Sequence, residues 1–125
     1  MRRMLIVEDE PDICDCLQLY FTSHGFSVET AFSGEQALDH LTDEQGQPEV
    51  VLLDIVLPGI SGLEVLRRLK DLYPEARVIM VSSLSDPDVQ AEARTCGASG
   101  YVTKPFDLSE HTWSNVLVED GPIAR

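Results

Sequence analysis

Basic residues are scarce in this chain, where nine Lys and Arg stand against 22 Asp and Glu and leave a formal net charge of −13. Such an excess of negative charge repels phosphate backbones, so we expect no nucleic-acid binding by this domain alone. Long apolar runs are also missing, because the hydrophobic stretches have only strand length and the N-terminal residues lead directly into the first of them. The sequence therefore predicts no membrane anchor and, by default, a cytoplasmic location.

Cysteine is equally rare. Cys14, Cys16 and Cys96 are an odd number of thiols without zinc-type spacing, and we interpret them as packing or surface residues. The chain of 125 residues is nevertheless long enough to form one domain with an apolar core that needs neither disulfides nor a structural metal.

What the chain does have is an alternation of strand and helix signals that occurs five times. Alternation of this kind is typical of an α/β domain, in which helices cover both faces of a parallel sheet. Strands buried on both faces are expected as short continuous apolar runs. We predict strands at residues 4–7, 28–31, 50–53, 77–81 and 100–103.

The intervening helices are marked by start and stop signals. Pro11 opens the first helix and Gly25 ends it, and the spacing of Ser33 and Gln36 is that of a capping box. Further helices are indicated by an apolar stripe over residues 65–72 that Pro74 stops, and by Asp86-Pro87 as a start with Gly97 as a stop.

The last helix is predicted from about Leu108, but the positions that should continue its buried face, His111, Thr112 and Asn115, are polar. Two alternatives remain open. The helix packs through a rotated face, or it stays partly disordered until a partner binds. The rotated face would use Trp113, Val116 and Leu117.

Charged residues follow three of the apolar runs. Glu8 and Asp9 follow the first, Asp54 follows the third, and Lys104 follows the fifth. Because ligand chemistry gathers at the carboxyl ends of parallel strands, these side chains are expected to converge. Convergent carboxylates repel one another unless a cation lies among them, and hard oxygen ligands suit Mg²⁺. Asp54 is therefore a candidate nucleophile beside a metal.

These residues give the chain a resemblance to the receiver domains of two-component response regulators. It rests on Glu8-Asp9, on Asp54 with Leu57-Pro58 and Gly62, on Ser82, and on Lys104-Pro105-Phe106, each after a predicted strand. The resemblance implies a flavodoxin-like three-layer sandwich with about five helices and a five-stranded parallel sheet of order 2-1-3-4-5. The expected receiver covers residues 1–118, and residues 119–125, with a turn signal at Asp120-Gly121-Pro122, form a tail or the start of a linker.

The resemblance also implies a function in phosphorelay signal transduction. Asp54 would accept a phosphoryl group from the phosphohistidine of a sensor kinase or from a phosphotransfer protein. Asp9, Asp54 and the backbone carbonyl of Val56 would bind Mg²⁺, with Glu8 acting through a bound water. Apart from catalysing its own phosphorylation and dephosphorylation, the domain would not be an enzyme.

A switch belongs to the same family pattern. Lys104 would pair with Asp54 before phosphorylation and with a phosphoryl oxygen afterwards, and Ser82 can hydrogen-bond the phosphoryl group only by moving toward it. Tyr101 would then turn into the space behind Ser82. The phosphorylation state would be displayed on the surface formed by the helix after Asp86, the strand at residues 100–103 and the last helix, through which homodimers or other complexes form.

Other phosphate chemistries fit the residues less well. Acidic residues after the first strand repel a flavin phosphate, and Val56 stands where the haloacid dehalogenases carry their second acid. No Walker loop is present to hold ATP, so the donor would be another protein or a small phosphodonor. The alternative function is a phosphorylation-independent interaction module that retains the receiver fold.

Two further expectations come from the family pattern. Val56 and Leu84, each two residues beyond Asp54 or Ser82, are apolar where some receivers carry polar groups that help water reach the phosphoryl group. We therefore expect slow self-dephosphorylation. The peptide bond between Lys104 and Pro105 is expected to be cis.

Overall fold

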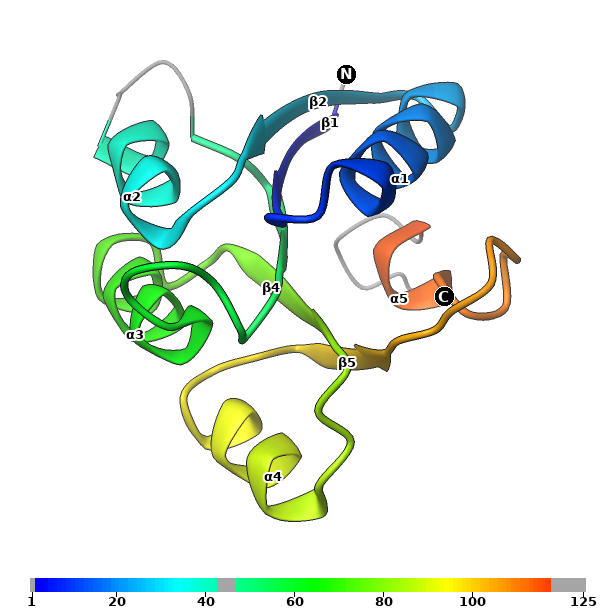
Figure 1. The fold of residues 1–125 in the computed structure, drawn as a ribbon. Helices are drawn as coiled ribbons and strands as arrows, with labels where there is room; N and C mark the ends of the chain where they lie inside the picture. Colours follow the sequence, from blue (N-terminus) through cyan, green and yellow to red (C-terminus); the bar gives the residue numbers. More distant parts are fainter. Residues whose placement is uncertain (1, 43–46, 118–125) are drawn as a thin grey trace.

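The computed structural model describes residues 2–42 and 47–117, which form a five-stranded parallel sheet of order β2-β1-β3-β4-β5 (Figure 1). The predicted sheet and its strand order are confirmed. Residues 50–53 and 100–103 match the structure, and the other three strands are one or two residues longer than expected. The strands are β1 (Arg2–Val7), β2 (Phe26–Ala31), β3 (Val50–Leu53), β4 (Arg77–Ser82) and β5 (Gly100–Thr103).

Helices cover both faces of the sheet, as the predicted three-layer sandwich requires (Figure 1). The first and last helices pack on one face, and the other three pack on the opposite face. No helix in the described ranges is long and apolar enough to cross a membrane. The helices are α1 (Pro11–Ser23), α2 (Gly34–Thr42), α3 (Gly62–Leu72), α4 (Pro87–Thr95) and α5 (Ser114–Leu117).

The continuous apolar run of β3 is explained by two cores, one on each side of the sheet. Val51 and Leu53 face the core formed with α2, α3 and α4, whereas Val50 and Leu52 face the core formed with α1 and α5. All four side chains are buried, and burying each one stabilises the fold by about 1.5–3 kcal/mol. The central position of β3 therefore places Asp54, the next residue, in the middle of the sheet edge.

Local hydrogen bonds form the helix starts that the sequence indicates. The Ser33 hydroxyl accepts from the Gln36 amide at 3.1 Å, and the Gln36 side chain accepts from the Phe32 amide at 2.9 Å, which makes a capping box displaced by one residue. Asp86 caps α4 by accepting from the Asp88 amide at 2.8 Å.

The prediction of a last helix from about Leu108 is wrong, because α5 begins only at Ser114. The preceding segment is organised by Asp107, whose carboxylate accepts from the hydroxyls of Ser109 and Thr112 at 2.7 and 2.6 Å. Short polar side chains of this kind compete with the helical backbone for hydrogen bonds. A helix therefore does not form across residues 107–113.

The rotated-face alternative for the last helix is confirmed within the described residues. Trp113 and Val116 are fully buried in the core on the α1 side, and Leu117 packs against it. The Trp113 ring meets Phe21 and Phe106 edge-on at centroid distances of 5.3 and 5.2 Å. The turn expected at residues 120–122 and the tail from residue 119 onward lie outside the described residues.

Candidate functional site

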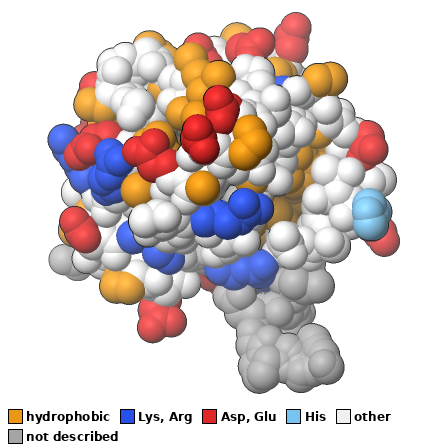
Figure 2. Space-filling view, turned by 90° about the horizontal axis from the view of Figure 1, so that it is seen from below, with side chains coloured by type: hydrophobic (Ala, Val, Ile, Leu, Met, Phe, Trp, Pro, Cys, Tyr) orange, Lys and Arg blue, Asp and Glu red, His pale blue; other side chains and the backbone are white. Residues whose placement is uncertain are grey.

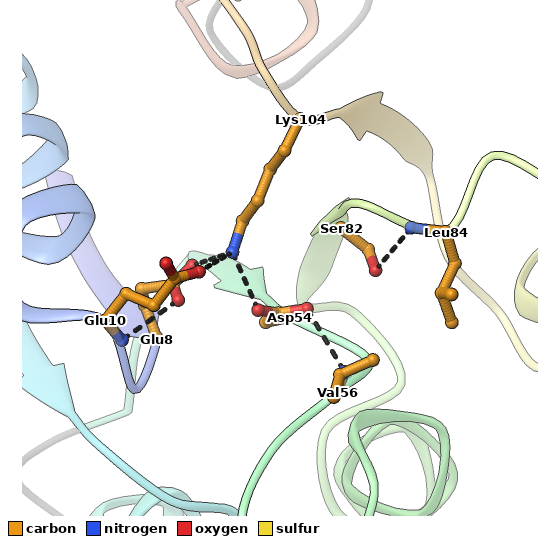
Figure 3. Close-up of polar contacts among 7 residues, drawn as sticks. All are labelled: Glu8, Glu10, Asp54, Val56, Ser82, Leu84 and Lys104. Carbon is orange, nitrogen blue, oxygen red and sulfur yellow. Dashed lines mark hydrogen bonds and ion pairs between the residues drawn. The ribbon is translucent and has the colours of Figure 1, made fainter.

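The candidate site lies at the carboxyl edge of the sheet, where residues from the ends of several strands meet (Figure 3). Backbone hydrogen bonds extend the parallel ladders one residue beyond the strands. The Asp54 amide donates to the Val7 carbonyl at 3.1 Å, and the Lys104 amide donates to the Ser82 carbonyl at 2.9 Å. The sheet therefore holds the backbones of these residues in fixed register before any side chain interacts.

Lys104 is the centre of the site, and its side chain is only 11% exposed. Its ammonium lies 2.9 Å from carboxylate oxygens of both Glu8 and Asp54 and 3.1 Å from one of Glu10 (Figure 3). An ammonium has three N–H donors, so three carboxylates satisfy it completely. The predicted meeting of Glu8, Asp54 and Lys104 is therefore seen in the structure.

Burial and charge shift the proton affinities of this cluster. Burial raises the pKa of Glu8 above its ordinary value, and hydrogen bonds from Lys104 and from the Glu10 amide only partly oppose this, while the charge of Asp54 adds to it. Burial alone would lower the pKa of Lys104, but its hydrogen bonds to Asp54 and Glu8 and their charges outweigh burial and raise it. Lys104 is therefore a stable cation at neutral pH.

The carboxylates around Lys104 could hold a metal ion, although they are not the set that the sequence predicts. Oxygen atoms of Glu8, Glu10 and Asp54 all lie within 4.8 Å of one another. With all three ionised and Lys104 protonated, the cluster carries two net negative charges, which suits a divalent cation. Asp9 is exposed and stands outside this group, so its role as a ligand remains a prediction.

The backbone amides of Val56 and Glu10 also donate hydrogen bonds to carboxylates of the site. The Val56 amide donates to the Asp54 carboxylate at 3.1 Å, which fixes the rotation of that side chain, and the Glu10 amide donates to Glu8 at 3.2 Å. The sequence-based prediction missed Glu10. Its only signal was an acidic residue directly before the Pro11 that starts α1, and the strand pattern alone does not place its side chain beside Lys104.

Ser82 and Tyr101 are joined through Leu84, which follows β4. The buried Ser82 hydroxyl accepts from the Leu84 amide at 3.2 Å, while the Tyr101 hydroxyl donates to the Leu84 carbonyl. The Tyr101 ring packs against the core on the α2 and α3 side, and burial raises the pKa of its hydroxyl. Tyr101 therefore remains a protonated donor at neutral pH. The expected cis peptide between Lys104 and Pro105 is also present.

Comparison with known families identifies the family of this chain. The model of the response regulator receiver domain family matches residues 4–112. This chain belongs to the response regulator receiver domain family.

Two curated relatives show how the domain occurs in proteins of different length. The transcriptional regulatory protein DltR of Streptococcus agalactiae is 37% identical over 86% of this chain but only 47% of its own length. The sporulation initiation phosphotransferase F of Bacillus subtilis is also 37% identical, over 86% of both chains. The chain thus spans about half the length of the first relative and most of the second.

A solved structure with the same fold belongs to a complex that contains BeF3 and Mg²⁺. A chain of the CheX–CheY–BeF3–Mg²⁺ complex from Borrelia burgdorferi has 30% sequence identity and a TM-score of 0.86. The similarity covers 94% of this chain and 90% of that chain.

Proposed function

We propose that this domain is a phosphorylatable signalling receiver in which Asp54 accepts a phosphoryl group. The observation that carries the proposal is the position of the Asp54 carboxylate, which belongs to a side chain only 5% exposed and is held 2.9 Å from the Lys104 ammonium at the carboxyl edge of the sheet. The contacts with Lys104 and with the Val56 amide fix the rotation of this carboxylate, one oxygen of which would attack phosphorus. The phosphoryl donor would be a phosphohistidine of a sensor kinase or of a phosphotransfer protein.

In the proposed reaction, an Asp54 oxygen forms a bond to phosphorus while the bond from phosphorus to the histidine nitrogen breaks. The electron pair of the broken bond returns to the imidazole. Phosphoryl transfer depends mainly on positioning and on neutralising the charge of the equatorial oxygens. Lys104 would donate to one of these oxygens, and Ser82 would donate to another after leaving its contact with the Leu84 amide.

Mg²⁺ would neutralise charge between the carboxylates and the incoming phosphoryl group. Asp9, Asp54 and the Val56 carbonyl would hold it directly, with Glu8 acting through a water. The buried carboxylates of Glu8 and Asp54 support such a site, and the similar Borrelia protein is described with Mg²⁺ and beryllofluoride.

The proposed switch uses the contacts around Leu84. If Ser82 turns toward the phosphoryl group, the Leu84 amide loses its acceptor, and the Tyr101 bond to the Leu84 carbonyl connects this change to β5. The proposed output surface is formed by α4, β5 and α5. Figure 2 views the molecule from below Figure 1, where α4 lies, and shows acidic, basic and hydrophobic side chains interspersed on that face. Homodimerisation through this surface is part of the proposal.

The domain boundary and location are also proposals. Residues 1–118 would form the receiver and residues 119–125 a tail or the start of a linker, in a cytoplasmic protein. The spans of the relatives are compatible with a separate receiver and with one joined to an output domain.

Intact-mass measurement tests the proposed function. The chain would be incubated with acetyl phosphate and Mg²⁺, in parallel with Asp54→Ala and with a metal-free control. One phosphoryl adduct on the native chain alone is expected. A folded native chain that forms no adduct and does not bind beryllofluoride would instead indicate a phosphorylation-independent interaction module.

A further inference from the structure

Glu10 contacts Lys104 from an unusual position. It is the residue immediately before α1, with an extended backbone (φ −90°, ψ 112°), and its side chain makes no capping hydrogen bond to that helix. Short side chains such as Asp or Ser normally cap a helix from this position. The Glu10 carboxylate reaches instead to Lys104, which is 94 residues away in sequence, and lies 3.1 Å from its ammonium.

The three partners of Lys104 differ strongly in burial. The side chains of Glu8 and Asp54 are 2% and 5% exposed, whereas that of Glu10 is 60% exposed. Separating Lys104 from either buried carboxylate leaves that charge with a backbone amide but without a cation, which is costly in a buried position. Water readily replaces Lys104 around the exposed Glu10 carboxylate. Glu10 is therefore the partner whose release costs least.

We infer that Glu10 is a positioning residue that holds Lys104 in the unphosphorylated state and opposes its transfer to the phosphoryl group. The inference rests on the proposed function. Phosphorylation converts the Asp54 carboxylate into an acyl phosphate and so frees the donor that Lys104 gives to it, but Glu10 and Glu8 still compete with the phosphoryl oxygens for Lys104. Once released, the Glu10 carboxylate still faces the added negative charge and repels it.

The hold of Glu10 on Lys104 and its repulsion of the added negative charge both disfavour the phosphorylated state. Removing the Glu10 carboxylate removes one competitor for Lys104 and also removes the repulsion, so the phosphorylated state should become more favourable. A metal-binding role for Glu10 predicts a change of the opposite sign. Loss of a ligand would weaken the binding of Mg²⁺ and, with it, the binding of beryllofluoride, which mimics the phosphoryl group. The direction of the change therefore separates the two roles.

The experiment measures beryllofluoride affinity in the full chain at a subsaturating Mg²⁺ concentration, at which weaker Mg²⁺ binding would still lower the affinity. For Glu10→Gln we expect binding about two- to fivefold tighter, as for the loss of an exposed ion pair. Glu10→Asp keeps the charge but shortens the side chain, so it should also bind the mimic more tightly than the native chain. Asp12→Asn removes a charge from the first turn of α1 without removing an ion pair to Lys104, and it serves as the matched control.

Unchanged or weaker binding by Glu10→Gln, or an equal gain in Asp12→Asn, would overturn the inference. Urea unfolding of each variant checks that the domain remains folded. The native chain and Asp54→Ala are measured alongside. If the native chain binds no mimic, the proposed function fails, whereas native binding without a Glu10 effect refutes only the role of Glu10.

Discussion

Replacing Gly62 with alanine tests how closely α3 approaches the backbone of Asp54. A Cβ at Gly62 would lie 2.0 Å from the Asp54 carbonyl oxygen and 2.7 Å from the Ile55 Cα, whereas ordinary van der Waals contact begins at 3.4 Å. The Gly62 amide also donates to the Ile55 carbonyl at 2.8 Å, which holds the two segments together. The new methyl group would therefore meet backbone atoms rather than the movable end of a side chain.

The expected cost follows from that contact. Overpacking of a well-packed site costs about 1–3 kcal/mol, and the gain in helix propensity from Gly to Ala, about 1 kcal/mol at most, offsets part of it. Because the added Cβ would meet backbone atoms, the overpacking cost lies at the upper end of this range, and after the propensity gain the free energy of unfolding of Gly62→Ala should fall by about 2–3 kcal/mol. Because the strain displaces the backbone of Asp54, beryllofluoride affinity should fall as well.

Urea unfolding with a matched glycine replacement provides the assay. At Gly100, an added Cβ would lie 3.1 Å from the end of the Ile79 side chain and 3.3 Å from that of Asn115, so small side-chain shifts accommodate it. Gly100→Ala should change the free energy of unfolding by less than about 1 kcal/mol. A Gly62→Ala variant as stable as Gly100→Ala would refute the close approach and its role in positioning Asp54.

Three further predictions concern groups around the site. Val56 is 56% exposed beside Asp54. Val56→Asn should shorten the lifetime of the phosphoryl group several-fold in a radiolabel decay assay. A native lifetime of seconds that the substitution leaves unchanged would contradict slow self-dephosphorylation. Tyr101→Phe removes the hydrogen bond to the Leu84 carbonyl and should lower the free energy of unfolding by about 0.5–1.5 kcal/mol, whereas an unchanged urea midpoint would mean that this bond adds nothing. Glu8→Gln should stabilise the metal-free domain more at pH 7.5 than at pH 4.5, and an equal effect at both values would contradict the raised pKa of Glu8.

The sign of the Glu8 prediction follows from proton linkage. Its pKa is higher in the folded chain than the ordinary value of 4.5, chiefly because the carboxyl is buried. The favourable contribution of this group is therefore fully present below pH 4.5 and is lost as the pH rises through the folded pKa. The raised pKa of Lys104 does not interfere, since its contribution is lost only above its ordinary value of 10.5.

Local sequence signals predicted the bounds of an element correctly where burial or backbone geometry allows only one residue pattern. The run at residues 50–53 matches β3 because both faces of that strand are buried, and Gly25 and Gly97 end their helices with φ values of 91° and 112°. The start of the last helix was predicted wrongly, because there the local pattern is not decisive. Its polar residues were visible in sequence, but their hydrogen bonds to Asp107 depend on a loop conformation that periodicity does not encode.

The sequence by itself therefore determined the α/β class and which residues stand at the carboxyl ends of the strands, because the period and length of apolar runs reflect burial directly. Together with the family pattern it also indicated Asp54, Ser82 and Lys104. Only the tertiary structure decided that Glu10 rather than Asp9 reaches Lys104, and that Ser82 and Tyr101 share Leu84. These contacts depend on side-chain directions across segments far apart in sequence, and no local pattern specifies such directions.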